Sequence, residues 1–389
     1  MKQLLLLAVA IAVGQFANSM ILPALPLLAR DLGVPAGSAG LVVTAYFAGF
    51  AVIGLVVGPL SDHVGRRPLL VGGIALLALG SLACAFAASF AVLLACRLLE
   101  AAGAAGAPVL SRAIVRDTRQ GGDLAAALGL LATIMSVSPV VGPILGGFVA
   151  EAVGWRGLFG FLAILGALAS FAVYAGISET LAPSTAKGAG TTRHQMRMLL
   201  AQPRFRKGVF FGAAFYFAFG AIYTSAPFVL IDRFGLGHLQ FGAAFAIMSA
   251  SLVVGGLVGP RLMRTPAQAS LLDAAAMLAI AAGLLLLAFM VSGEESVAAI
   301  VLCLALFGLA FGVALSVGAA LTLSDVGEAV GTASSLSGFL QVGAAALGSA
   351  VVSFLHDGST TPLSVILGFA GLAALCTIPR MDERRTAGM

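Results

Sequence analysis

Long apolar runs separated by short polar segments dominate this chain. Twelve runs can be drawn, each near the roughly 20 residues that an α-helix needs to cross a bilayer core. They cover approximately 4–28, 40–60, 69–88, 90–111, 124–150, 157–178, 208–231, 240–260, 269–291, 297–320, 329–354 and 361–379. Because lipid cannot satisfy exposed backbone groups, such runs predict helices rather than open sheets. The pattern therefore predicts an all-α integral membrane protein with 12 transmembrane helices.

One connection, 181–207, is much longer than the rest and is rich in Thr, Ala, Gly and Arg. We expect it to be a cytoplasmic linker between six-helix bundles at 1–180 and 208–389. The second half repeats features of the first at an offset of 201: Pro26 and Pro227, Gly58-Pro59 and Gly259-Pro260, Val141-Gly142 and Val342-Gly343, Gly147 and Gly348. Parallel repeats of this kind are typical of secondary transporters that bind substrate between two pseudo-symmetric halves.

The charges of the chain are few and unevenly placed. Charged residues make up 10% of the sequence and hydrophobic residues 60%, which excludes an ordinary soluble protein. Seventeen of the 21 Lys and Arg residues fall in alternate gaps: Lys2, Arg66, Arg67, Arg112, Arg116, Arg119, Lys187, Arg193, Arg197, Arg204, Arg206, Lys207, Arg261, Arg264, Arg380, Arg384 and Arg385. The positive-inside rule places these gaps and both termini in the cytoplasm. Cations spread over short loops also argue against a nucleic-acid partner, despite the net charge of +5.

Groups suited to catalysis or metal binding are scarce. The four cysteines stand singly in apolar runs, and the four histidines are scattered in or near loops. With no Ser/His/Asp group, metal-ligand cluster or nucleotide-binding motif, we expect no enzyme, no cofactor and no metal site. The apolar run after Lys2 continues to Leu28, too long for the core of a signal peptide, so we interpret it as an uncleaved first span.

The segment after the second run reads GPLSDHVGRRP, beginning at Gly58. Gly58 permits close helix approach, and Asp62 can accept hydrogen bonds from a helix N-terminus or pair with a cation. Gly65 suits a tight turn, while Arg66 and Arg67 are expected at the cytoplasmic surface.

This segment resembles the signature G-x-L-x-D-x-x-G-R-R/K of the major facilitator superfamily, with every fixed position present. The resemblance implies a gating element, made of these residues together with Arg112, that latches the outward-open state. It also implies that Asp62 lies against the start of the eleventh span, near Gly331.

Two further stretches resemble motifs of the same superfamily. The fourth span reads RLLEAAGAAGAPVLSRAIVRD, similar to R-x-x-Q-G-x-G and to the R-A-I-V-R-D stretch of bicyclomycin/chloramphenicol-type drug exporters. The fifth reads SPVVGPILGG, similar to the antiporter motif G-x-x-x-G-P-x-x-G-G with Ser138 in place of the first glycine. Its prolines should bend the helix and its glycines should permit close helix contact, at Pro139, Gly142, Pro143, Gly146 and Gly147.

Arg97 is the cation left inside a span, and Glu100 lies three residues further on. Counted from Phe90, they lie about 10 and 15 Å deep and share a helix face, so they can pair. Ionisable groups at such depth usually line a cavity, which suggests a proton-coupling site; the alternative is an ion pair that only supports the fold. The exporters that the chain resembles commonly carry Asp in the first span, where this chain has Asn18. We therefore infer that the titratable carboxylate has moved to Glu100.

If family geometry holds, spans 1, 4, 7 and 10 line a substrate pocket. Span 7 places Phe215, Phe219 and Tyr223 on one helical face, as expected for an aromatic wall, although core or lipid packing would explain the series equally well. Further candidate contacts are Asn18, Tyr46, Met135 and Gln341. Without a carboxylate at position 18, neutral or zwitterionic compounds are favoured over strong cations.

The resemblance implies a monomeric, proton-coupled multidrug antiporter of a bacterial inner membrane. It would export small amphipathic organic compounds by alternating access, with protons, substrate and lipid as partners. A specific exporter of a metabolite or amino acid fits the same motifs. A membrane sensor is disfavoured because the chain contains no soluble signalling domain.

Overall fold

The computed structural model describes residues 2–181, 189–263, 270–323 and 330–378. Its elements are α1 Lys2–Ser19, the 3₁₀-helix η1 Leu22–Ala24, α2 Leu25–Asp31, α3 Ala36–Ala39, α4 Leu41–Val64, α5 Arg66–Ala85, α6 Phe90–Thr118, α7 Gly121–Gly176, α8 Ala189–Ala201, α9 Pro203–Pro227, the π-helix η2 Phe228–Arg233, α10 His238–Leu262, α11 Leu271–Ser292, α12 Val297–Leu323, α13 Val330–Leu355 and α14 Thr361–Cys376. No strand occurs in these ranges, which confirms the all-α fold class.

The number of membrane crossings also agrees with the prediction. Ten helices among the described residues are long and apolar enough to span a membrane. One of them, α7, has 56 residues and would extend about 84 Å if straight, far beyond a bilayer core. It instead turns back at Gly154, whose φ of 70° belongs to the left-handed region, and so supplies two crossings. The shorter apolar helix α14 completes the twelve.

Each half begins with a helix that is interrupted near its outer end, the end opposite the predicted cytoplasmic loops. In the first half, α1 stops at Ser19, and the chain continues through η1 and α2 past Pro23 and Pro26. In the second half, α9 ends at Pro227 and passes into the π-helix η2. Because a proline removes one backbone donor and crowds the preceding turn, both irregularities follow from the sequence. They occur at positions that the offset of 201 relates.

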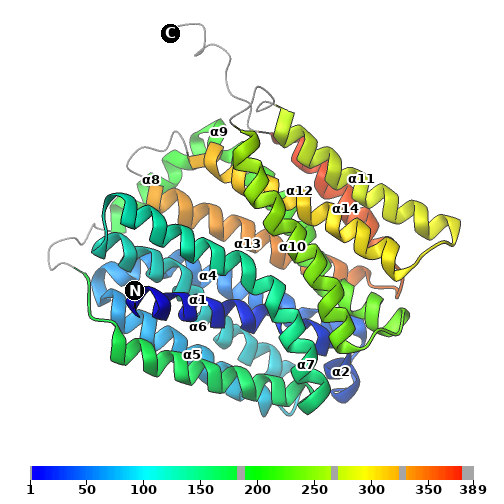
Figure 1. Cartoon of the computed structure of the whole chain (residues 1–389), viewed down its shortest axis with the longest axis horizontal. Helices are drawn as coiled ribbons and strands as arrows, with labels where there is room; N and C mark the ends of the chain where they lie inside the picture. The colour runs from blue at the N-terminus through cyan, green and yellow to red at the C-terminus, as the bar shows by residue number, and fades with distance from the viewer. Residues whose placement is uncertain (1, 182–188, 264–269, 324–329, 379–389) are drawn as a thin grey trace, which may run out of the picture.

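Helix packing repeats between the halves as well. In the half formed by α1–α7, α1 packs on α7, α4 on α6 and α5 on α7. In the half formed by α9–α14, the corresponding pairs are α9 with α13, α10 with α12 and α11 with α14. The two halves form separate groups in Figure 1 and meet through α4 with α13 and α7 with α10. We call these groups the N-half and the C-half.

Some boundaries differ from the sequence expectation. The segment GPLSDHVGRRP is almost wholly helical, because α4 continues to Val64 and α5 starts at Arg66. The long linker contains the helix α8, and its residues 182–188 lie outside the described residues. Lys187, Arg264, Arg380, Arg384 and Arg385 also lie outside them, so the domain limits and the full charge pattern stay predictions.

Candidate functional site

The predicted pair of Arg97 and Glu100 forms in the interior of the N-half. Arg97 Nη1 lies 2.5 Å from Glu100 Oε2, and neither side chain is exposed. Ser81 of α5 donates to Glu100 Oε1 at 2.6 Å. The carboxylate thus faces α5, and it is held by one cation and one hydroxyl rather than left as an isolated buried charge.

The guanidinium of Arg97 extends the other way, towards α1 and α4. It donates to the carbonyl oxygens of Ala17 at 3.1 Å and Val42 at 3.4 Å. It also lies over the ring of Tyr46, 4.5 Å from the centroid, and Tyr46 in turn donates to the Gly14 carbonyl at 2.7 Å. One side chain therefore ties three helices of the N-half to the charge of Glu100.

Two polar atoms of this region have no partner. Arg97 Nη2 and Asn18 Oδ1 are both buried and make no hydrogen bond in the described part of the chain. Buried polar groups are usually satisfied, so these two atoms are exceptions to the rule. Arg97 donates to the carbonyl of Ala17, the residue before Asn18, so Asn18 lies at a similar depth to the arginine.

The aromatic residues of span 7 lie in different surroundings. Phe215 is buried inside the C-half, where it stacks on Phe311 with ring centroids 6.0 Å apart. Phe219 is partly exposed, and Tyr223 lies 4.3 Å from it between ring centroids. Both approach Phe47 of α4, with centroids 6.4 and 5.9 Å away, and so form an aromatic contact between the halves.

Phe47 and Phe311 were not among the candidate pocket residues. Phe47 follows Tyr46 in span 2, a span that was not expected to line the pocket. Phe311 lies in the expected span 10, but it belongs to no aromatic series that would single it out. Of the other candidates, Tyr46 is only 1% exposed beneath Arg97, and Gln341 packs on Gly212, where an added Cβ would lie 2.4 Å from Gln341 Nε2. These candidates therefore lie in two separate places: Tyr46 lies with Arg97, and Phe219 lies with Tyr223.

Met135 and Arg112 contact each other. Arg112 Nη2 donates to Met135 Sδ at 3.0 Å, joining α6 to α7. Arg112 lies within α6, because this helix continues to Thr118, seven residues beyond the expected end of the span at 111. Its gating role stays a prediction, because this hydrogen bond leads to α7 and not to the segment around Asp62.

The residues of the predicted gating segment form a network at the inner end of the N-half. Arg66 pairs with Asp62 at 2.7 Å and with Asp117 at 3.4 Å. Gly65 adopts a φ of 108°, which a side chain would strain. Gly58 lies near α13, since an added Cβ would be 3.9 Å from Ser335 Oγ. The proposed contact of Asp62 near Gly331 stays a prediction.

Glu179 completes this network and was missed from the sequence. Its carboxylate accepts from the backbone N–H groups of Arg66 at 3.0 Å and Arg67 at 3.1 Å, and so caps the N-terminus of α5. Burial acts to raise the pKa of Glu179, but the backbone donors of Leu181, Arg66, Thr180 and Arg67 together hold it below the ordinary value. Arg67 also lies 4.8 Å from the Tyr174 ring centroid.

The antiporter-like glycines of α7 lie against other helices. An added Cβ at Gly142 would lie 2.0 Å from Ser19 Oγ, and one at Gly146 would lie 2.1 Å from the Met20 carbonyl oxygen. Gly147 meets the other half, with His238 O 2.4 Å from such a Cβ. Pro139 and Pro143 stay within helical backbone, and α7 leaves helical geometry only at Gly154.

The outer ends of the halves are joined by polar contacts. Arg30 pairs with Asp232 at 2.6 Å, and Leu239 N donates to Glu151 at 3.0 Å. Deeper in, Ser349 Oγ lies 2.7 Å from Thr44 Oγ1 and 2.6 Å from Thr224 Oγ1, linking α4, α13 and α9. These contacts hold the outer side of the junction closed in this conformation.

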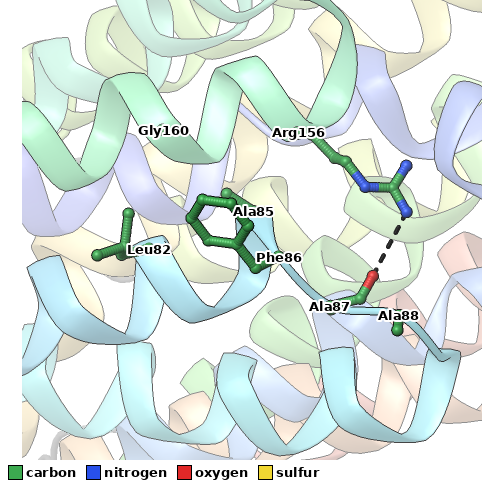
Figure 2. A pocket seen from close by; sticks show the side chains of 7 residues that line it. All are labelled: Leu82, Ala85, Phe86, Ala87, Ala88, Arg156 and Gly160. Atoms are coloured by element: carbon green, nitrogen blue, oxygen red, sulfur yellow. Dashed lines mark hydrogen bonds between the residues drawn. The ribbon is translucent and has the colours of Figure 1, made fainter.

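A surface pocket of about 530 Å³ lies at the outer end of the N-half (Figure 2). It is lined by Leu82, Ala85, Phe86, Ala87, Ala88, Arg156 and Gly160, and Arg156 donates to the Ala87 carbonyl at 3.4 Å. These residues belong to α5, the start of the α5–α6 loop and the second crossing of α7, and Arg97 and Glu100 are not among them.

Twelve membrane crossings in two joined bundles, with an ion pair buried inside one bundle of the described chain, define a multi-pass membrane transporter rather than an enzyme. A family model described as Major Facilitator Superfamily matches residues 7–379. The chain belongs to this superfamily.

Known proteins similar to this chain agree with that assignment. It is 32% identical to the uncharacterized MFS-type transporter YdgK of Bacillus subtilis, over 93% of this chain and 90% of that protein. It is also 32% identical to a chloramphenicol resistance protein of Pseudomonas aeruginosa, over 60% of this chain and 55% of that protein. The solved structure of a D-xylose–proton symporter has the same fold, with a TM-score of 0.79, 15% identity and 98% of both chains covered.

Proposed function

We propose that this protein is a proton-coupled antiporter of a bacterial inner membrane that exports small amphipathic organic compounds. The observation that carries the proposal is the buried pair of Arg97 and Glu100. An ionisable pair inside a membrane bundle is costly to retain, and in transporters such groups commonly relay protons. The similarity to a chloramphenicol resistance protein supports drugs as cargo.

The contacts of Arg97 suggest how a proton would act on the halves. Protonation removes the negative charge of Glu100 and weakens its attraction for the guanidinium. Arg97 would then rearrange its bonds to Ala17 and Val42, which belong to α1 and α4. Because α4 packs on α13 of the C-half, a shift of α4 changes the junction through which the halves rock. Glu100 is fully buried in this conformation, so it would exchange its proton in another one.

The direct test is export in inverted membrane vesicles from an efflux-deficient host. Chloramphenicol and a panel of other drugs should accumulate in vesicles energised with a proton gradient, and a protonophore should abolish accumulation. Glu100→Gln should abolish gradient-driven accumulation, whereas Glu294→Gln, at an exposed outer-loop glutamate, should not change it. Accumulation that survives both the protonophore and Glu100→Gln would refute proton coupling through this residue.

A specific exporter of a metabolite or amino acid remains the second candidate, since the same fold carries both functions. In the same vesicles, transport of one metabolite without transport of any drug would favour it.

A further inference from the structure

The long connection between the halves and the helix that follows it carry positive charge only. From residue 180 to residue 231 the sequence has no acidic residue and six cations: Lys187, Arg193, Arg197, Arg204, Arg206 and Lys207. The side chains of Arg197, Arg206 and Lys207 are exposed, and none of the three forms an ion pair with a described residue. The inner end of the N-half differs, because Arg66 there pairs with two aspartates. At the inner end of the C-half, three exposed cations are therefore left to an anion from outside the described chain.

The helix α8, which carries Arg197, is fixed at this inner end against α9 and α13 (Figure 1). Its Leu199 is buried in an apolar cluster with side chains of both helices. Thr332 Oγ1 of α13 also donates to Gln195 Oε1 of α8 at 2.7 Å. On either side of Leu199, Met198 and Leu200 are 54% and 41% exposed. One face of α8 thus rests on the C-half, and apolar as well as basic side chains beside that face stay uncovered.

The first turn of α9 lies at the level of the lipid headgroups. Arg206 and Lys207 directly precede the apolar run that begins at residue 208. The span Pro203–Arg233 has 31 residues and extends about 46 Å, more than the hydrocarbon core of roughly 30 Å, so its ends reach into the headgroup regions. Phe210 lies one turn beyond Arg206 on the same helix face and is 55% exposed, so this face is turned away from the other helices and towards lipid.

Cations at headgroup level beside exposed apolar side chains match an anionic phospholipid. Guanidinium and ammonium groups bind phosphate oxygens strongly, and apolar side chains of an interfacial helix enter the boundary between headgroups and acyl chains. A soluble anion would neutralise the cations but leave the apolar side chains in water, whereas a lipid without net charge would do the reverse.

We propose that α8 and the first turn of α9 bind anionic phospholipids of the inner leaflet through Arg197, Arg206 and Lys207. Clusters of basic residues on amphipathic helices next to a membrane span are suited to such lipids. The bound lipid would hold the inner end of the C-half, and α13 with it, at a fixed depth in the membrane. The proposal concerns the membrane partner, so it stands whether the cargo is a drug or a metabolite.

The test compares two lipids with the same acyl chains and different headgroup charge: dioleoyl phosphatidylglycerol and dioleoyl phosphatidylcholine. Binding of each to the purified full-length protein in detergent is measured by native mass spectrometry. Since each cation near an anionic lipid contributes roughly fivefold in affinity, the wild type should bind phosphatidylglycerol about tenfold or more tightly. Arg197→Gln/Arg206→Gln/Lys207→Gln should remove this preference. An excess of glycerophosphoglycerol, the headgroup without acyl chains, should not displace the lipid.

Arg116→Gln/Arg119→Gln/Arg261→Gln is the matched control, because it removes three cations from the inner ends of other helices and should leave the preference intact. A wild type without preference for phosphatidylglycerol would overturn the proposal, as would an unchanged preference in the first triple variant. Equal loss in the control would indicate only the general field of the inner surface, and displacement by glycerophosphoglycerol would indicate a site for a soluble anion; either result decides against a lipid site here. If the first triple variant does not fold, Arg206→Gln and Lys207→Gln are measured singly. Each should lower the affinity for phosphatidylglycerol roughly fivefold and leave that for phosphatidylcholine unchanged, and no change in both variants would refute the site.

Discussion

The hydroxyl of Ser349 should control how readily the outer ends of the halves separate. It is fully buried and lies within hydrogen-bond distance of both Thr44 and Thr224. In Ser349→Ala, Thr224 keeps its bond to the Gly220 carbonyl at 3.0 Å, but Thr44 loses its hydroxyl partner across the junction. The closed arrangement thus loses a net stabilisation of about 1 kcal/mol, which raises the outer-open population roughly fivefold.

Distances between spin labels on the two halves measure this population. Labels at Ala88→Cys and Glu294→Cys occupy exposed outer-loop positions, in a background where exposed Cys376 is replaced by Ser. Double electron–electron resonance should show a larger long-distance fraction in Ser349→Ala. Ser170→Ala is the control, because that hydroxyl donates to the Val71 carbonyl at 3.1 Å within the N-half. If Ser349→Ala changes the distribution no more than Ser170→Ala does, the hydroxyl cluster does not hold the junction closed.

Three further outcomes follow from the packing and charges described above. Gly348→Ala should destabilise the protein by about 1–3 kcal/mol, since the new Cβ would lie 1.8 Å from the Phe217 carbonyl oxygen. Gly343→Ala should stabilise it by about 0.5–1 kcal/mol, because nothing lies within 4 Å of the new Cβ. Thermal unfolding that ranks the two variants otherwise contradicts the packing. Tyr46→Phe should lower the free energy of unfolding by about 1 kcal/mol, because it loses the hydrogen bond to Gly14. Tyr46→Leu should lower it by about 2 kcal/mol more, because it loses the ring beneath Arg97. Equal melting temperatures of the two variants would show that the cation–π contact adds nothing. Because the pKa of Glu179 is held below 4.5 in the folded protein, its stabilising effect is present above that pH and is lost as the pH falls through the lower folded value. The melting temperatures of wild type and Glu179→Gln should therefore differ near neutral pH and converge in acid. Curves that stay parallel would argue against the cap.

The crossings could be predicted because the bilayer sets a length that each apolar run must meet. Pairing of Arg97 with Glu100 could be predicted for a similar reason, since helical geometry alone brings residues three apart together. The turn at Gly154 falls in the predicted gap between spans 5 and 6. The gap was expected to be a loop of several residues, but only Gly154 leaves helical geometry.

The rest of the site depends on which way each helix is rotated. Phe215 lies on a predicted pocket helix and Tyr46 was a candidate pocket residue, yet both face the interior of their own halves, and apolar spans give no polar face to indicate this. Glu179 could not be recognised because its partner Arg66 lies 113 residues away in the sequence. Such contacts join residues that are far apart in the sequence, and no local sequence pattern indicates that they will be neighbours.

The neighbouring glycines 146 and 147 have a consequence for how this transporter can evolve. Gly146 meets the backbone at Met20 of its own half, and Gly147 meets the backbone at His238 of the other. At Gly147 the two halves therefore meet main chain on main chain, and the shape of this contact does not depend on a side chain. Side chains elsewhere at the junction, such as Phe47 and Phe219, can be exchanged for others while this contact keeps its dimensions. Such side chains can therefore change along a lineage, whereas a single methyl group added at Gly147 would push the two halves apart at this contact.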